Sequence, residues 1–175
     1  SDQYVRATPG GVGEAKTAGN YAACNLAEKQ AQAQGFTQVL WLDAVERKYI
    51  EEVGSMNIFF VIDDEIVTPQ LNGTILPGIT RKSVLELARH WDLKTSERRI
   101  SIDEVLEGLE SGRVSEVFGA GTAAVISPVG LLHYRGQSSQ VGDGQTGPVA
   151  KRFFQHLTAI QYGRENDPFG WVETV

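Results

Sequence analysis

A lysine lies in a glycine-rich run near the start of the chain. Lys16 follows glycines at positions 10, 11 and 13 and precedes another at position 19, and glycine permits backbone conformations that are closed to other residues. A lysine in such a loop, in a chain that later carries the acidic pair Glu51-Glu52, can present its amine to the carbonyl group of a cofactor. The alternative interpretation is a solvated loop lysine, which describes most lysines.

Two other segments have features of anion sites. Residues 77–80 (Pro-Gly-Ile-Thr) precede a helical pattern, and the free N–H groups and dipole of a helix start favour negative charge. Residues 119–123 (Gly-Ala-Gly-Thr-Ala) can offer backbone N–H groups and the Thr122 hydroxyl to a phosphate or carboxylate. The alternatives are a plain turn and cap for the first segment and a glycine-rich bend between strands for the second. Residues 51–57 place two carboxylates beside a glycine, and a solvated surface turn is the alternative there.

These weak signals gain meaning in combination. Pyridoxal phosphate chemistry needs a lysine for a Schiff base, an acid that pairs with the ring nitrogen, and a phosphate cup, which commonly lies at a helix start. The sequence supplies such parts in chain order: Lys16, Glu52, Ile79 with Thr80, and Thr122.

Composition excludes several other classes of function. The chain has 175 residues and a formal net charge of −6, without the basic stripe that a nucleic-acid-binding domain needs. No apolar run reaches the roughly 18 residues of a membrane span. The single cysteine, Cys24, precludes an internal disulfide, and the three scattered histidines show no metal-ligand spacing, so we expect no metal site.

Helices alternate with strands along the chain, which predicts a mixed α/β fold. Helical spacing, capping residues and Gly or Pro boundaries predict helices at residues 20–34, 81–91, 101–109 and 148–162. Short apolar runs predict strands at residues 38–43, 57–62 and 66–68, and at 114–118 and 122–127, the last two separated by a bend at 119–121.

The chain resembles the large, C-terminal domain of branched-chain amino acid aminotransferases, which have the type IV pyridoxal phosphate fold. The resemblance is carried, in the order of the family, by residues 4–7, 16–21, 39–42, 52–57, 75–81, 121–123, 127–129 and 160–164. The run Leu-Pro-Gly-Ile-Thr-Arg at 76–81 is shared across the wider fold. The run Glu-Val-Gly-Ser-Met-Asn at 52–57 and the Tyr-Gly-Arg at 162–164 are typical of the branched-chain enzymes.

The resemblance implies a role for each matching residue. Lys16 would form the Schiff base and move the substrate's proton, and Glu52 would pair with the pyridine N–H. The other cofactor contacts implied are Tyr21 to the phenolic oxygen with Arg6 as a second candidate, the backbone N–H groups of Ile79 and Thr80 to the phosphate, and the hydroxyl of Thr122 to the phosphate. Ser55 and the backbone N–H of Ala123 would hold the substrate carboxylate.

The resemblance also implies an architecture and an activity. We expect residues 1–175 to form a single cofactor-binding domain with a pseudo-barrel-like fold, without the small N-terminal domain of the family. The implied activity is transamination of leucine, isoleucine and valine with 2-oxoglutarate or glutamate, by a homodimer in the cytoplasm, or in mitochondria if an upstream targeting segment was removed. The alternatives are a D-amino acid aminotransferase or aminodeoxychorismate lyase of the same fold, which usually differ at residues 52–57, or a non-catalytic cofactor-binding fragment.

Overall fold

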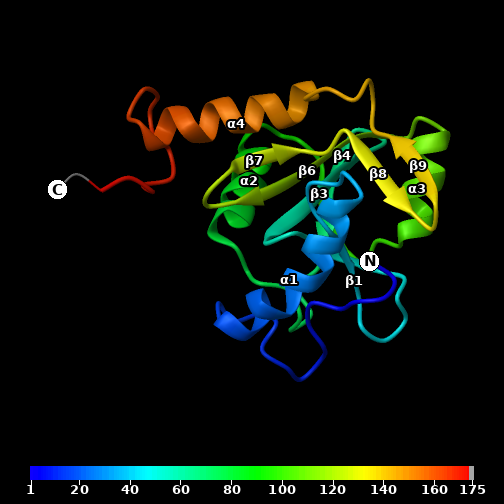
Figure 1. Ribbon diagram of the computed structural model, residues 1–175. Coiled ribbons are helices and arrows are strands. Elements are labelled where there is room, and N and C mark those ends of the chain that lie inside the picture. The colour runs from blue at the N-terminus through cyan, green and yellow to red at the C-terminus, as the bar shows by residue number, and fades with distance from the viewer. Residues whose placement is uncertain (174–175) are drawn as a thin grey trace.

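The computed structural model describes residues 1–173, in which a seven-stranded sheet and a separate two-stranded hairpin are covered by helices (Figure 1). The helices are α1 (Ala18–Ala33), α2 (Ile79–His90), α3 (Ile102–Glu110) and α4 (Pro148–Gln161). The strands of the large sheet are β1 (Leu40–Leu42), β2 (Ile50–Val53), β3 (Met56–Ile62), β4 (Glu65–Pro69), β5 (Thr95–Arg98), β6 (Val114–Gly121) and β7 (Val125–Pro128). The hairpin is formed by β8 (Leu131–Tyr134) and β9 (Gln137–Gln140).

Strand β3 organises the large sheet. Almost its whole length pairs with β6 along one edge, while its first residues pair with β2 and its last residues with β4 on the other edge. Strand β5 joins β4 in parallel, and the remaining pairs are antiparallel. The N–H of Ile50 donates to the carbonyl of Ile100 at 2.9 Å, so the start of β2 also meets the segment after β5 and the sheet curls back on itself. The mixed α/β, barrel-like fold predicted from the sequence is confirmed.

The apolar run in β3 is continuous because both faces of the strand are buried. Ile58, Phe60 and Ile62 pack into a core with residues of α3 and the β8–β9 hairpin. Phe59 and Val61 pack on the opposite face with residues of α2 and α4. Figure 1 shows α4 running beside β7 and α3 lying beside the hairpin. The alternation places odd-numbered residues of β3 on the α2 side of the sheet.

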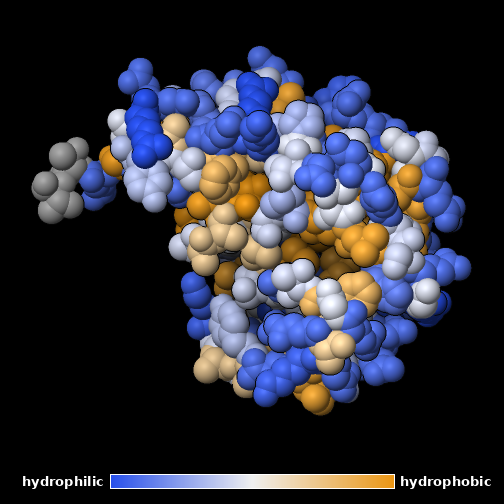
Figure 2. Space-filling view, turned by 45° about the horizontal axis from the view of Figure 1, so that its top comes forward, coloured by the Kyte–Doolittle hydropathy of each residue, from blue (hydrophilic) through white to orange (hydrophobic). Residues whose placement is uncertain are grey.

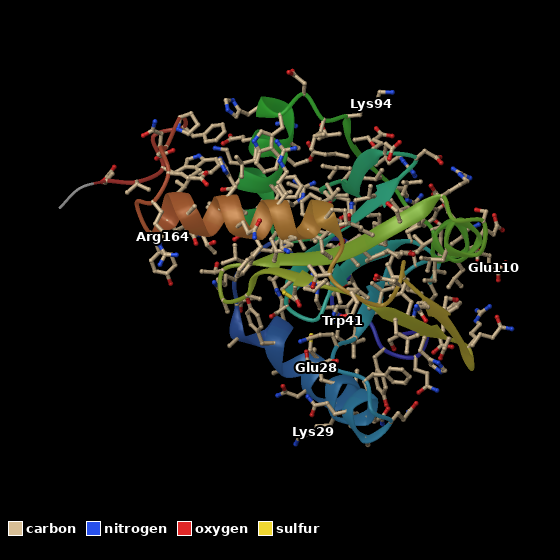
Figure 3. All side chains as sticks on the ribbon, turned by 90° about the horizontal axis from the view of Figure 1, so that it is seen from above. Glu28, Lys29, Trp41, Lys94, Glu110 and Arg164 are labelled. Atoms are coloured by element: carbon tan, nitrogen blue, oxygen red, sulfur yellow. The ribbon has the colours of Figure 1, made fainter. Side chains whose placement is uncertain are left out.

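Helix α1 covers a different part of the sheet. Its buried residues Cys24 and Ala27 pack against Trp41 of β1, and the Trp41 Nε1 donates to the Gly54 carbonyl at 2.9 Å. Figure 3 shows Trp41 on the side of the sheet toward α1, which also carries Glu28. The helix therefore docks directly beside the turn between β2 and β3.

Most of the predicted elements are confirmed with small shifts of their ends. Helix α1 ends ahead of Gly35, whose φ of +86° suits glycine. The Ser101 Oγ accepts a hydrogen bond from the Glu104 N–H at 3.0 Å, which is the N-cap half of the predicted capping box, while the Glu104 carboxylate pairs with Arg98. Strands β2, β5, β8 and β9 were not predicted, because a run of four residues is too short to show a clear alternation of apolar and polar side chains.

The predicted bend at residues 119–121 is wrong. These residues continue β6, which pairs with β3 through the partners Asn57 and Ala120, and the turn lies at residues 122–124. A Cβ at Gly119 or Gly121 would lie 2.9 Å from the Met56 side chain. Glycine is therefore used here for close packing within a strand, not for a bend.

The alternative of a solvated surface turn at Glu51-Glu52 is also wrong. Both residues belong to β2, and they are 2% and 4% exposed. The turn lies after them, at Gly54 and Ser55, with a φ of +55° at Gly54.

Candidate active site

A pocket of about 220 Å³ opens between α1, the N-terminal loop and the turn from β2 to β3. It is lined by Arg6, Gly13, Ala15, Asn20, Tyr21, Cys24, Asn25, Glu28, Glu52, Gly54, Ser55, Asn57 and Leu76. Four residues singled out from the sequence share this lining: Arg6, Tyr21, Glu52 and Ser55. The pocket therefore brings together residues from four separate parts of the chain.

Glu52 is the buried acid of this pocket. Its Oε1 accepts hydrogen bonds from the Leu76 N–H at 3.1 Å and from the Asn57 Nδ2 at 3.4 Å. Burial raises the pKa of Glu52 to about 7, against the opposing effects of the Arg6 charge and the Leu76 N–H. Functional sites often contain a buried carboxyl whose pKa is shifted toward neutral pH.

Arg6 is the cationic partner of Glu52. Its Nε lies 3.0 Å from the Glu52 Oε2, and the two side chains are 6% and 5% exposed. The rest of the guanidinium is directed to backbone carbonyls, that of Gly13 at 3.4 Å and that of Thr74. Arg6 thus joins the acid to the loop before α1 and to the segment before α2.

The loop that carries Lys16 is held by the first turn of α1. The Asn20 Nδ2 donates to the carbonyls of Val12 at 2.8 Å and Ala15 at 2.9 Å. Lys16 itself is exposed and does not line the pocket, although Ala15 beside it does. Tyr21, one turn along α1, is 41% exposed and lines the pocket.

The start of α2 presents open backbone donors. Gly78 occupies the N-cap position without a side-chain cap, and the first turn holds no acidic residue. Ile79 is 78% exposed and Thr80 is half-buried. Because the first N–H groups of a helix have no intrahelical partner, this end of α2 suits an anion such as phosphate.

Ser55, Thr122 and Ala123 lie at the same end of the sheet. The pairing of Asn57 with Ala120, and the packing of Gly121 on Met56, bring the turn before β3 beside the turn after β6. All three residues are exposed. Strand register, rather than sequence proximity, therefore brings Thr122 near the β2–β3 turn.

Sequence reasoning missed several residues of this site, among them Asn20, Cys24, Asn57 and Leu76. Asn57 is 5% exposed and opens an otherwise apolar strand, and a polar residue at such a position was the available signal. The contacts of Leu76 with Glu52 and Asn57 join distant segments, and the sequence holds no local sign of them. The Asn20 side chain instead bonds to Val12 and Ala15, which lie close to it in the chain.

A second concave surface lies beside the other end of α1. A wider groove of about 700 Å³ runs between the end of α1 and the β8 strand, and Figure 2 shows one hollowed face on which apolar residues gather inside a hydrophilic surround. Within residues 1–173, no helix combines the length and the apolar character needed to cross a bilayer. The described part of the chain also holds no group of three His, Cys, Asp or Glu side chains arranged for a metal ion.

Comparison with known proteins identifies the family. A sequence family described as amino-transferase class IV matches residues 2–132, which is most of the chain. The chain belongs to this family. The class IV aminotransferase chain is 56% identical over 173 residues to branched-chain-amino-acid aminotransferase 2 of Bacillus subtilis (strain 168), covering 99% of the chain and 48% of that protein. It is 55% identical over 170 residues to a probable branched-chain-amino-acid aminotransferase of Staphylococcus aureus (strain N315), covering 97% of the chain and 48% of that protein.

Solved structures agree with the sequence comparison. The branched-chain amino acid aminotransferase from Escherichia coli matches with a TM-score of 0.83 and 34% identity, over 98% of this chain and 55% of that one. The branched-chain amino acid aminotransferase of T.th., complexed with N-(5'-phosphopyridoxyl)-L-glutamate, matches with a TM-score of 0.83 and 32% identity, over 98% of this chain and 54% of that one. The class IV aminotransferase chain thus spans about half the length of the curated relatives that it matches.

Proposed function

We propose that this protein is a pyridoxal phosphate-dependent aminotransferase that acts on branched-chain L-amino acids with 2-oxoglutarate or glutamate. The observation that carries the proposal is the buried Glu52 carboxyl, paired with Arg6 inside a pocket that the lysine loop borders. The two relatives and two solved structures described above are all named as branched-chain aminotransferases, which supports the choice of substrates.

The residues present fit pyridoxal phosphate, because they supply complementary groups for its ring and its phosphate. The Glu52 carboxyl lines a pocket bordered by a second polar side chain, Tyr21. The start of α2 leaves its first N–H groups without a side-chain cap, which suits a phosphate. Glu52 would hold the ring nitrogen, Tyr21 the phenolic oxygen, and the N–H groups of Ile79 and Thr80 the phosphate.

When bound, pyridoxal phosphate supplies an electron sink for the electron pair left as a proton leaves the α-carbon of an amino acid. Glu52 contributes the charge opposite the ring nitrogen, since a carboxylate favours a protonated nitrogen beside it. Arg6 keeps the Glu52 carboxyl more acidic than burial alone would leave it. The Arg6 charge, together with the Leu76 N–H, therefore offsets part of the rise in the Glu52 pKa that burial causes.

Lys16 holds and moves the proton at the substrate's α-carbon through its Nζ atom. The hydrogen bonds from Asn20 restrict the backbone at Val12 and at Ala15, the residue before Lys16, so the lysine is presented from an ordered loop. Thr122 adds its hydroxyl at the phosphate end, and Ser55 with the Ala123 N–H holds the substrate carboxylate. These roles use two turns that the β3–β6 register brings together.

The proposal is tested by reduction with borohydride in the presence of pyridoxal phosphate, followed by peptide mass mapping. We expect the cofactor mass on the peptide that contains Lys16 and no label in a Lys16→Ala variant. Lys29, an exposed lysine of α1 (Figure 3), supplies the control, since Lys29→Arg should leave the label in place. Label on another lysine, or on none, rejects the role of Lys16.

Substrate class is tested by single-turnover assays on the full-length protein with leucine and with D-alanine. Conversion of leucine is expected, and conversion of D-alanine alone would favour the D-amino acid aminotransferase alternative. The homodimer and the cytoplasmic location expected from the sequence remain proposals. Analytical ultracentrifugation tests the homodimer.

A further inference from the structure

Asn57 stands opposite Glu52 in the sheet. The two residues are direct partners in the β2–β3 ladder, so their side chains lie on the same face. Both are buried, at 5% and 4% exposure. A polar pair of this kind inside a sheet needs hydrogen-bond partners, and these come from the segment that leads into α2.

The two side chains hold one residue, Leu76, from both sides. The Leu76 N–H donates to the Glu52 Oε1 at 3.1 Å, and the Leu76 carbonyl accepts from the Asn57 Nδ2 at 2.8 Å. The same Nδ2 lies 3.4 Å from the Glu52 Oε1. Carboxyl, amide and peptide therefore form one connected group.

The amide oxygen of Asn57 meets the start of α2. A Cβ at Gly78, the N-cap residue, would overlap the Asn57 Oδ1. The Gly78 N–H also donates to the Leu76 carbonyl at 2.8 Å. The first turn of α2 is thus placed by Asn57 through two routes, one polar and one steric.

We propose that Asn57 is a positioning residue that sets the distance between the Glu52 carboxyl and the open N-terminus of α2. The inference rests on the proposed function, in which one cofactor engages both groups at once. A ligand with two binding groups gains affinity only where both of its sites are held at the right spacing. Asn57 therefore matters for a ligand that bridges the two sites and much less for either half of it.

The test compares a bridging ligand with its halves. Pyridoxamine 5'-phosphate, pyridoxamine and inorganic phosphate are titrated calorimetrically into the wild-type protein and into Asn57→Ala. We expect Asn57→Ala to raise the dissociation constant of pyridoxamine 5'-phosphate at least ~10-fold, or about 1.4 kcal/mol. The dissociation constants of pyridoxamine and inorganic phosphate should change less than ~3-fold. Parallel weakening of all three ligands, or no weakening of any, overturns the proposal.

A matched control removes a similar hydrogen bond elsewhere in the same sheet. The buried Thr68 of β4 donates from its Oγ1 to the Ile58 carbonyl at 2.7 Å. Thr68→Val should lower stability while leaving the affinity ratio among the three ligands unchanged. If Thr68→Val also selectively weakened the binding of pyridoxamine 5'-phosphate, general loosening of the sheet would be the cause and the proposal would fail.

A second variant tests the steric route. Gly78 has a φ of −65° and a ψ of 139°, which alanine also adopts, so Gly78→Ala acts only through the space that its methyl group needs. We expect Gly78→Ala alone to raise the dissociation constant of pyridoxamine 5'-phosphate at least ~5-fold. In a protein that already carries Asn57→Ala, the same change should raise it less than ~2-fold further. Additive effects in the double variant contradict the contact between Asn57 and Gly78.

Failure of the proposed function is distinguished by a measurement without ligand. If the wild-type protein binds no pyridoxamine 5'-phosphate, the cofactor assignment falls. Hydrogen exchange of the Leu76 amide then tests the positioning role of Asn57 without any ligand. We expect exchange at least ~10-fold faster than in the wild type for Asn57→Ala, and no such increase for Thr68→Val. Unchanged exchange in Asn57→Ala overturns the positioning role.

Discussion

Replacing Glu52 by glutamine should change how the protein's stability depends on pH. Burial raises the pKa of Glu52 from an ordinary value of 4.5 to about 7 in the folded chain. Between these two pH values the folded state holds more protons at Glu52 than the unfolded state does. The contribution of this carboxyl to the free energy of unfolding is therefore fully present below pH 4.5 and is lost as the pH rises through 7.

The magnitude follows from the two pKa values. Each pH unit between them is worth about 1.4 kcal/mol, so the free energy of unfolding of the wild type loses about 3 kcal/mol through Glu52 between pH 4.5 and pH 8. Glu52→Gln lacks this titration. The free energy of unfolding of the variant, minus that of the wild type, should rise by about 3 kcal/mol over the same range.

The assay is urea unfolding of both cofactor-free proteins at pH 4.5, 5.5, 6.5, 7.5 and 8. Only the change with pH is interpreted, because glutamine also removes the partner of Arg6 and so adds a constant offset. Glu110→Gln, on an exposed residue of α3 (Figure 3), serves as the control, with a flat difference expected. A flat difference for Glu52→Gln as well would refute the claim that burial holds the Glu52 carboxyl protonated up to neutral pH.

Three further predictions concern the neighbours of the site and the frame of the fold. Arg6→Gln should raise the pKa of Glu52 above 7, because the Arg6 charge opposes the effect of burial, and carbon NMR of labelled glutamate measures this directly. Gly147→Ala should destabilise by about 2 kcal/mol in urea unfolding, since a Cβ there would overlap the Glu116 carboxylate, which accepts the first N–H groups of α4 at 2.8 and 2.9 Å. Ser101→Ala should cost about 1 kcal/mol, because it removes the N-cap bond of α3.

Matched variants accompany the two stability predictions. Gly19→Ala places a methyl group in open space and should not destabilise the protein. Ser111→Ala, at the other end of α3, should change the free energy of unfolding by less than about 0.5 kcal/mol. If Gly147→Ala and Gly19→Ala behave alike, or if Ser101→Ala and Ser111→Ala do, the capping explanation is wrong.

The sequence was informative wherever the signal was local. The capping box at Ser101, the glycine after α1 and the apolar run of β3 predicted elements that are confirmed, since each depends on residues a few positions apart. The family resemblance also rested on local runs such as residues 76–81. Local patterns failed at residues 119–121, where glycine serves close packing against Met56 instead of a bend.

The sequence by itself determined which chemical groups the chain carries: a lysine in a glycine-rich loop, an acid, and a helix start free of acidic residues. Only the tertiary structure decided that the acid is buried and paired with Arg6, and that Asn57 and Leu76 connect it to the start of α2. The physical reason is that the pKa of a carboxyl depends on its desolvation and its partners. Both are set by strand register and packing between distant segments, which no short stretch of sequence encodes.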